Sequence, residues 1–388
     1  MSELNASNLR KEHRNEGPDL VRVTELTSPY FMVPPSGTTA ERPQNPEKGT
    51  LRFNTDIGSL EYFRGDTIGW ECINSYSPNL GDQNLTNSAR GTGARGLYFC
   101  GSTPGDNEIN NINYITISTF GDAQDFGDAT VAVRQGTGLS SSTRGLHIGG
   151  FDGSNRKTDI GYVTIATTGD AVSFGDLSET VIGNPAGISN GTRGISAMGE
   201  SPGNTNQIEY ITIATTGNGK DFGDMSYEAQ APFGCGSSTR GIIAGGSNPT
   251  VKNNIEYITM SSTGNSVDFG DLVQERRTGG KGQSSNSTRM IFYGGLQPTY
   301  RDYITYITIA TKGNDTDFGD APAPIGYSAA MASSTRCVFA GGSTSDPTSV
   351  NTISSIEFAT TGNAVDFGDT TVGNRTGLVG ASNGHGGL

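Results

Sequence analysis

The stretch that decides the fold is Tyr162-Val-Thr-Ile-Ala-Thr-Thr-Gly-Asp-Ala-Val-Ser-Phe-Gly-Asp176, because close copies of it recur along most of the chain. The copies start 48, 48, 47, 49 and 49 residues apart, and the sixth is degenerate. A period of this length, with alternating apolar and polar residues, is typical of a small β unit repeated about six times. The copies begin at Tyr114, Tyr162, Tyr210, Tyr257, Tyr306 and Ser355.

Composition also favours short strands. Hydrophobic residues make up 32% of the 388 positions and glycine occupies 57 of them, which is too little apolar content for a large helical or doubly wound core. The net charge of −13 argues against nucleic acid as a partner, because phosphate binding needs a basic surface. No apolar run approaches the roughly 20 residues that span a bilayer, and residues 1–16 lack the apolar segment of a signal peptide. We therefore expect a protein made in a cytoplasm and not inserted in a membrane.

Catalytic and metal-binding patterns are not recognisable in the sequence. The four cysteines have no metal-site spacing and are expected to be buried free thiols. No triad or metal set can be assembled from His13, His147 and His385. The Phe-Gly-Asp letters occur six times without the other kinase motifs, so the phenylalanine is expected to pack between repeats and the glycine to let the outer strand turn. We expect neither enzyme activity nor a cofactor. The cysteines are Cys72, Cys100, Cys235 and Cys337.

The chain divides into three predicted segments. Residues 1–48 are polar and rich in proline, which predicts an extended arm ordered by neighbouring molecules. Residues 49–78 predict a small β module, and the repeats fill residues 79–388. The module contains three candidate strands, at 50–54, 59–63 and 69–73.

Each repeat can be divided into four strands. The first precedes Ser-Ser-Thr-Arg, the second ends in Gly-Gly, the third carries Tyr-Ile-Thr-Ile, and the fourth carries Phe-Gly-Asp after a Thr-Gly-Asn turn. Four strands in about 48 residues is the size of one propeller blade. This order resembles the kelch repeat, with phenylalanine where kelch blades usually carry tryptophan. The resemblance implies an all-β, kelch-like β-propeller of four-stranded blades over residues 79–388.

A shortened first repeat predicts how the ring would close. Asp128 to Arg144 spans 16 residues, whereas Asp82 to Arg95 spans only 13, so the first inner strand is cut short. Residues 375–382 form a spare inner strand at the C-terminus. We expect this segment to complete the first blade and close a ring of six, which would remove the sheet edges. In the alternative, the module strands supply a seventh blade.

Two recurring charges suggest contacts between repeats. Every repeat has one arginine before its second strand and one aspartate at the end of its fourth, so we expect one Arg-carboxylate pair per junction. Acids spaced as Asp122, Asp125 and Asp128 could hold calcium, although Asp and Asn more often cap turns. The arginines are Arg95, Arg144, Arg193, Arg240, Arg289 and Arg336, and the aspartates are Asp128, Asp176, Asp224, Asp271, Asp320 and Asp369.

The loops between the second and third strands differ in every repeat, whereas the other turns barely change. In a four-stranded blade these loops and the blade-to-blade loops open on the same face. Variation confined to one face favours recognition there, with unselected drift as the alternative. The candidate binding residues are the aromatic and arginine side chains of this face, namely Phe151, Arg156, Tyr227, Arg276, Arg277, Tyr300 and Arg301.

Two segments resemble bacteriophage proteins. Residues 46–56, 60–66 and Trp70 look like a short β module of tail-fibre and virion proteins, and the Thr-Thr-Gly-Asn and Asp-Phe-Gly-Asp phrasing is similar to structural proteins of marine cyanophages. The resemblance implies a virion component, such as a tail fibre or appendage. Its arm would dock on other virion proteins and its propeller would meet a host-surface glycan or protein. A homo-oligomer, a purely architectural decoration protein and a glycan-degrading depolymerase are the alternatives that it leaves open.

Overall fold

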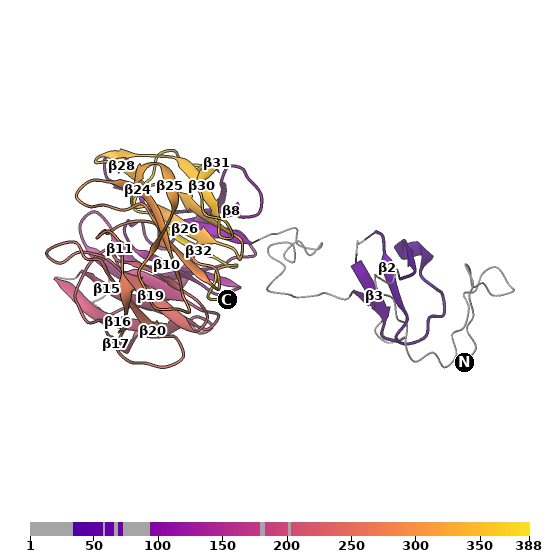
Figure 1. Cartoon of the computed structure of the whole chain (residues 1–388). Helices are drawn as coiled ribbons and strands as arrows, with labels where there is room; N and C mark the ends of the chain where they lie inside the picture. Colours follow the sequence, from indigo (N-terminus) through magenta and orange to yellow (C-terminus); the bar gives the residue numbers. More distant parts are fainter. Residues whose placement is uncertain (1–33, 57–58, 66–68, 73–93, 179–182, 201–202) are drawn as a thin grey trace. The chain divides into compact units, whose positions relative to one another are not determined.

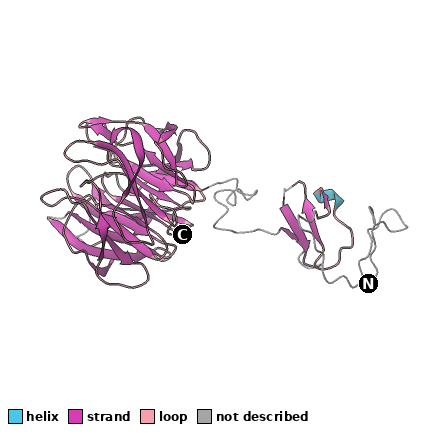
Figure 2. Cartoon of the chain, viewed as in Figure 1, coloured by secondary structure: helices cyan, strands magenta, loops and turns pink. Residues whose placement is uncertain are grey.

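The computed structural model describes residues 34–56, 59–65, 69–72, 94–178, 183–200 and 203–388. These residues form an all-β protein with many small sheets, most of them antiparallel, and their one helix is the short 3₁₀ turn η1 (Thr39–Glu41) (Figure 2). The chain divides into two compact units, Met1–Ser75 and Tyr76–Leu388 (Figure 1).

The smaller unit is one sheet with the strand order β1-β2-β3-β4. Three of these strands match the expected ones, but the expected end of the arm at residue 48 is corrected, because Ser36 and Gly37 already pair in parallel with Phe53 and Asn54. Residues 1–33 of the predicted arm lie outside the described residues. The strands are β1 (Ser36–Gly37), β2 (Leu51–Asn54), β3 (Ser59–Phe63) and β4 (Trp70–Cys72).

A buried charge cluster organises this small sheet. The Glu61 carboxylate is fully buried and accepts hydrogen bonds from Arg42 and Asn54, with the Arg52 guanidinium 3.6 Å away. Both guanidinium groups also lie over the Trp70 ring, at 5.9 and 6.0 Å from its centre. A buried carboxylate is tolerated only with such partners, so removing Arg42 or Arg52 would leave the Glu61 charge less well compensated.

The larger unit consists mainly of six sheets, which we number 1 to 6 in chain order. Sheet 1 joins β32 (Val379–Ser382), β5 (Arg95–Phe99), β8 (Asn111–Thr116) and β9 (Gln124–Asp128). Sheet 2 joins β10 (Thr137–Ser140), β11 (Arg144–Phe151), β12 (Arg156–Thr164) and β13 (Val172–Asp176). Sheet 3 joins β14 (Ala186–Ser189), β15 (Arg193–Glu200), β16 (Asn204–Thr212) and β17 (Lys220–Asp224).

The remaining sheets follow the same plan with one irregularity. Sheet 4 joins β18 (Phe233–Gly236), β19 (Arg240–Ala244), β20 (Asn254–Thr259) and β21 (Val267–Asp271). Sheet 5 keeps only β23 (Arg289–Tyr293), β24 (Arg301–Thr308) and β25 (Thr316–Ile325). Sheet 6 joins β26 (Ala329–Ala332), β27 (Arg336–Ala340), β30 (Thr352–Glu357) and β31 (Val365–Asp369), and it also receives β22 (Lys281–Gly282). Two small hairpins decorate the loops, β6 (Ser102–Thr103) with β7 (Asn107–Glu108) and β28 (Ser343–Ser345) with β29 (Thr348–Ser349).

The C-terminal strand completes the first sheet. β32 runs antiparallel to β5, with Val379 opposite Phe99 and Ser382 opposite Gly96. The pairing expected from the shortened first repeat is therefore confirmed. The alternative in which the module strands supply a seventh blade is not supported, because these strands belong to the smaller unit and sheet 6 bonds directly to sheet 1.

Neighbouring sheets are joined by hydrogen bonds between an outer strand and the next Thr-Gly-Asn turn. At the junction of sheets 1 and 2, Gly169 N–H donates to the Phe126 carbonyl at 2.8 Å, and the Asp170 carboxylate accepts from Asp128 N–H at 3.0 Å. The glycine of Phe-Gly-Asp has a physical reason here. Gly127 has φ +146°, and a Cβ on it would lie 2.5 Å from the Gly169 carbonyl oxygen.

The same two hydrogen bonds recur at each junction and return from sheet 6 to sheet 1. Gly121 N–H donates to the Phe367 carbonyl, and the Asp122 carboxylate accepts from Asp369 N–H. The turn Asp and Asn side chains thus cap backbone N–H groups. The prediction was that they would cap turns, and the groups that they cap belong to the preceding sheet. Among the described residues, no group of three or more acidic, histidine or cysteine side chains could hold a metal ion.

A cyclic set of backbone hydrogen bonds lies before the inner strands. Six equivalent residues have φ between 53° and 68°, and each N–H donates to the carbonyl of its counterpart in the preceding sheet, at 2.7 to 3.0 Å. The last link runs from Gln135 N–H to the Gly377 carbonyl, so the set closes on itself. Its members are Gln135, Asn184, Ala231, Thr278, Tyr327 and Gly377.

Two extra residues in the fifth repeat fill the middle of this unit. Thr278 and Arg289 are 11 positions apart, whereas Gln135 and Arg144 in the second repeat are nine apart. With these two extra residues, β22 does not pair with sheet 5 and instead pairs in parallel with β26 of sheet 6. Lys281 Nζ donates to the carbonyls of Asn184 and Pro185 in the segment leading into β14 of sheet 3, at 3.1 and 3.0 Å.

The rest of the inserted segment reaches the other sheets. Gln283 Nε2 donates to the Gly138 carbonyl of sheet 2 at 3.0 Å, and Cys235 Sγ of sheet 4 lies 3.6 Å from Gln283 Oε1. A Cβ on Gly282 would lie 2.3 Å from the Gly380 carbonyl of sheet 1, so only glycine fits there. The segment therefore links all five other sheets.

His147 is an exception in the apolar layer between sheets 1 and 2. It is buried, its ring nitrogens have no hydrogen-bond partner, and burial lowers its pKa to about 4. The third residue after the arginine is apolar in three other repeats, as Ile243, Phe292 and Phe339, and is tyrosine or serine in the remaining two. His385 is also buried, and burial lowers its pKa to about 4 as well.

We expect His147→Ile to raise the free energy of unfolding at pH 7 by about 1 to 2 kcal/mol, because it removes two unpaired buried nitrogens. Both histidines have folded-state pKa values below the ordinary 6.5, so the unfolded chain binds more protons between pH 6.5 and 4. Stability should therefore be complete above pH 6.5 and fall toward pH 4, by up to about 3 kcal/mol for each histidine.

Urea denaturation at pH 7 and pH 5 measures both effects. The variant should be the more stable protein at both values and should lose less stability on acidification than the parent chain. A less stable variant at pH 7 would contradict the expectation and indicate that His147 makes a favourable contact.

Candidate functional site

Phe151 and Arg156 lie on the variable-loop face but are engaged in contacts within the chain. The Phe151 ring lies between two guanidinium groups, with Arg134 5.5 Å and Arg156 4.9 Å from the ring centre. Arg156 pairs with Glu200 at 2.7 Å, and Arg134 pairs with Glu108 and with Asp106. The cluster ties the loops of sheets 1, 2 and 3 together, so these side chains serve loop structure.

Two other predicted contact residues are engaged within the chain, with Tyr227 partly buried and Arg276 fully buried. Tyr227 donates its hydroxyl to the Gly245 carbonyl, and burial raises its pKa. Arg276 is 2% exposed and donates to the carbonyls of Gly294 and Tyr303. The expectation that Arg276 is a surface contact is therefore corrected.

Asp315 is the buried partner of Arg276. Its carboxylate lies 3.3 Å from the guanidinium and also accepts a hydrogen bond from the Thr305 hydroxyl. Desolvation lowers the Arg276 pKa to about 10, so the side chain stays charged at neutral pH. This pair is a structural feature that the sequence pattern did not indicate.

Arg277, Tyr300 and Arg301 are brought together and remain partly exposed. Leu296 forms backbone bridges with both Arg277 and Tyr300, so these two residues both lie next to Leu296. The Tyr300 ring meets Tyr327 edge to face at 6.5 Å, and burial raises the Tyr300 pKa. These four side chains, Arg277, Tyr300, Arg301 and Tyr327, form what we call the Tyr300 patch.

The patch is only loosely held by its own chain. Arg277 donates to the Ser247 hydroxyl at 3.3 Å, and Arg301 donates through Nε to the Gln297 carbonyl at 2.8 Å. Neither arginine forms an ion pair with a described residue, in contrast to Arg134 and Arg156. Two such guanidinium groups beside two tyrosines can bind hydroxyl, carboxylate or aromatic groups of a partner.

The recurring arginines do not make the ion pairs with aspartate that the sequence suggested. In five repeats the guanidinium lies over the tyrosine of its own sheet, 4.4 to 4.6 Å from the ring centre. In all six repeats, Nη1 donates at 2.5 to 2.9 Å to a carbonyl that follows the third strand of the next sheet. The terminal aspartates instead present their N–H groups to the next turn, so each junction uses backbone partners.

At the seam between sheets 6 and 1, the arginine does not lie over a tyrosine of its own sheet. Ser355 occupies the tyrosine position of sheet 6, as its pairing with Val365 shows. Arg336 therefore lies over Phe120 of sheet 1, 4.6 Å from the ring centre, and the Phe120 ring meets Phe367 at 5.3 Å. Phe120 is 57% exposed. The two departures are visible in the sequence, but nothing in the pattern indicates that they compensate each other.

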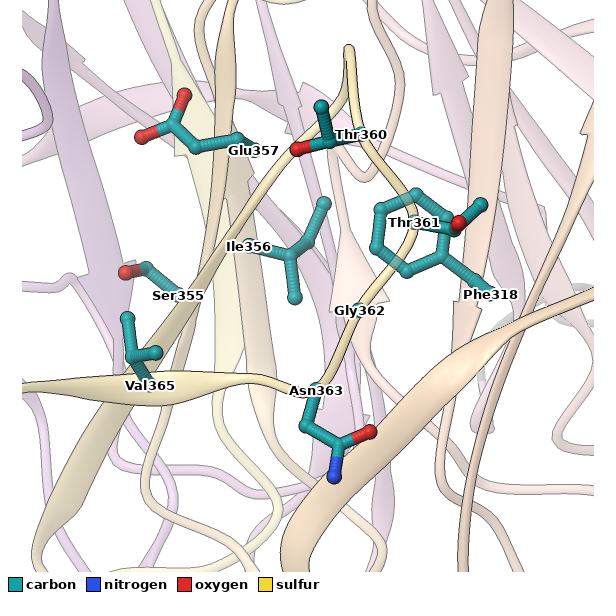
Figure 3. A pocket seen from close by; sticks show the side chains of 9 residues that line it. All are labelled: Phe318, Ser355, Ile356, Glu357, Thr360, Thr361, Gly362, Asn363 and Val365. Atoms are coloured by element: carbon teal, nitrogen blue, oxygen red, sulfur yellow. The ribbon is translucent and has the colours of Figure 1, made fainter.

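Two cavities lie at equivalent turns of sheets 6 and 1. The cavity of sheet 6 has a volume of about 140 Å³, and Figure 3 shows Ile356 between the strand carrying Ser355 and the turn carrying Gly362. The cavity of sheet 1 has a volume of about 430 Å³ and is rimmed by Phe120. Its lining comes from β8 and the turn after it, namely Tyr114, Ile115, Thr116, Thr119, Phe120, Gly121, Asp122, Ala123 and Gln124.

His147, His385, Cys100, Cys235 and Cys337 are dispersed and buried. His385 Nδ1 accepts from Gly387 N–H, and its Nε2 lies 3.4 Å from the Ser189 hydroxyl. Cys100, Cys235 and Cys337 are buried free thiols, as expected, and burial raises the pKa of Cys100 to about 12. Such thiols are poor nucleophiles. Within the described ranges, no helix has the length and apolar character needed to cross a bilayer.

Comparison of the chain with models of protein families found no match. Comparison with curated protein sequences found no match either. Function is therefore inferred from the geometry of the site and from the resemblance of the small module and the repeats to phage proteins.

We expect Phe120→Thr to lower the free energy of unfolding by about 1 to 2 kcal/mol, because Arg336 and Phe367 both lose their aromatic partner. Threonine occupies this position in most other repeats, as at Thr168, so the turn itself accepts it. Adding Ser355→Tyr restores the tyrosine found in the other five repeats. The double variant should return to within about 0.5 kcal/mol of the parent.

Denaturant midpoints of the parent, both single variants and the double variant complete the cycle. Independent effects of the two substitutions would contradict the compensation between Phe120 and Ser355. Thr168→Ala at the equivalent turn of sheet 2 is the control, and it should change the midpoint little because no aromatic contact is lost there.

Proposed function

We propose that the larger unit is a closed, six-bladed, kelch-like β-propeller that serves as a binding platform without chemistry of its own. Three cyclic sets of contacts support closure, and each runs from sheet to sheet and from sheet 6 back to sheet 1. They are the turn-to-strand bonds, the arginine-to-carbonyl bonds and the ring of positive-φ residues. Propellers of this type remove most exposed sheet edges.

The observation that carries a binding role is the unequal use of side chains on the two faces. The side chains that recur in every repeat, such as the arginine and the turn Asp or Asn, bond to backbone atoms of an adjacent sheet. The variable loops recur only in a backbone bridge at their first residue, as between Ser247 and Gln230. Their side chains follow no common pattern, and the Tyr300 patch stays partly exposed with two arginines that form no ion pair with a described residue. A rigid scaffold with one variable face suits recognition.

The inserted segment of the fifth repeat supports a binding site away from the middle of the six sheets. Lys281, Gly282 and Gln283 occupy the middle of the six sheets, and their polar groups are bonded to surrounding carbonyls. A ligand would thus contact the loops of the variable-loop face. This supports the loops, and the Tyr300 patch in particular, as the contact surface.

The resemblance of the small module and the repeats to phage proteins supports a virion setting. In this proposal the protein is part of a tail fibre or appendage, its N-terminal segment docks on other virion proteins, and the propeller is displayed toward the host surface. Architectural decoration and glycan degradation are the competing outcomes of the test below.

We expect fluorescently labelled full-length protein to bind cells of susceptible marine cyanobacterial strains. Arg277→Gln combined with Arg301→Gln should weaken binding at least tenfold, because it removes both charges of the Tyr300 patch while keeping hydrogen-bond donors. Val172→Thr, on an exposed outer strand away from these loops, is the matched control and should bind normally.

Flow cytometry over a range of protein concentrations gives the affinities, and a reducing-sugar assay on the same cells detects glycan cleavage. Unchanged binding by the double variant would contradict the role of the Tyr300 patch. Absence of binding by the parent protein would favour decoration, and release of reducing sugar would favour a depolymerase.

A further inference from the structure

The cavity of sheet 1 beside Phe120 departs from repeat symmetry. Its volume of about 430 Å³ falls within the range of about 300 to 1,000 Å³ that small-molecule sites occupy. The equivalent cavity of sheet 6 is about a third of that volume and is lined by the buried Phe318 and Ile356 instead of an exposed ring (Figure 3). The two turns have the same backbone plan, so their side chains account for the difference.

Phe120 gives this cavity an aromatic wall that stays accessible. More than half of the ring surface is exposed, which is the highest value among the described phenylalanines. The ring is held in place from behind by Arg336 and Phe367, and Arg336 is itself fixed by Glu357 and by the Ile117 carbonyl. A rigidly supported aromatic ring at a cavity rim binds with little loss of conformational entropy.

The rest of the lining is polar. Thr116 and Thr119 offer hydroxyl groups, and the Gln124 amide accepts a hydrogen bond from the Tyr114 hydroxyl while keeping its amide N–H donors. One Asp122 carboxylate oxygen caps Asp369, and the other has no hydrogen-bond partner among the described residues. Donors and acceptors thus surround one aromatic wall.

We propose that this cavity is a saccharide-binding site. A pyranose ring has an apolar face of C–H groups that can stack on Phe120 and an edge of hydroxyl groups that both donate and accept hydrogen bonds, which matches the polar lining. A purely apolar ligand would leave Asp122 and Gln124 unpaired. An anionic ligand would meet the Asp122 carboxylate. The site lies at a constant turn, so it is independent of the loop-face function proposed above.

Saturation-transfer NMR tests the proposal with the full-length protein and four named sugars, methyl α-glucoside, methyl β-galactoside, N-acetylglucosamine and rhamnose. At least one sugar should receive saturation through its ring C–H protons. Phe120→Thr combined with Ser355→Tyr should reduce the affinity at least tenfold, because it removes the exposed ring while returning an aromatic partner to Arg336.

A second variant keeps the ring and changes the polar side of the site. Gln124→Val introduces the residue found at the same position in sheets 2, 4 and 6, as with Val172, so the fold accepts it. It should weaken sugar binding several-fold. Arg277→Gln combined with Arg301→Gln should leave sugar binding unchanged, which separates this site from the Tyr300 patch.

Each outcome decides the proposal. No transfer to any of the four sugars, or equal transfer to the parent and to the Phe120→Thr, Ser355→Tyr variant, would overturn it. Sugar binding that persists in a protein unable to bind host cells would support the saccharide site and count against the function proposed for the loop face. Loss of cell binding without loss of sugar binding in the arginine variant would support both sites.

Discussion

The larger unit depends on the hydrogen bonds between each outer strand and the turn of the next sheet. A four-stranded sheet with inner strands of two to four residues has too little apolar area to be stable alone, so both of its faces must be covered by neighbours. The bonds from Gly169 to Phe126 and from Asp128 to Asp170 set the distance between two sheets, and their repetition leads back from sheet 6 to sheet 1. This requirement explains why Gly127 and its counterparts have no side chain, since a Cβ would collide with the approaching turn.

The same requirement determines which residues can carry function. The guanidinium groups and the turn Asp or Asn side chains that recur in every repeat are already bonded to backbone atoms of an adjacent sheet, so they are not free to contact a partner. The inserted segment around Lys281 fills the middle and is bonded there in the same way. What remains available is the variable-loop face and the seam at which the repeat pattern is broken.

The seam illustrates how an imperfect repeat changes a surface. Once serine stands at position 355, Arg336 needs another aromatic partner, and Phe120 of the next sheet provides it. The arginine keeps an aromatic partner, but this partner lies in an exposed turn of the next sheet instead of in a strand of its own sheet. That shift places an accessible ring beside a cavity, and the saccharide site that we propose follows from it. Phe120 thus both replaces the missing tyrosine as the partner of Arg336 and lines the candidate site.

The sequence by itself determined the local structure. Periodicity of 47 to 49 residues fixed the strands of each repeat, and the 13-residue span before Arg95 was enough to predict that the C-terminal segment pairs with β5. The strands follow from local alternation, and the terminal pairing follows from segment lengths counted along the chain.

Only the tertiary structure decided which groups meet. The arginines were expected to pair with aspartates, yet they bond to carbonyls about 70 residues away, or 219 residues for Arg336. Arg276 is buried although arginine is usually exposed, and Phe120 is exposed although phenylalanine is usually buried. Contacts between sheets depend on distances that no local pattern encodes, because a shift of one or two residues, such as the insertion in the fifth repeat, redirects whole side chains. The sequence therefore determined the repeating unit, and the packing of one unit against the next determined the sites.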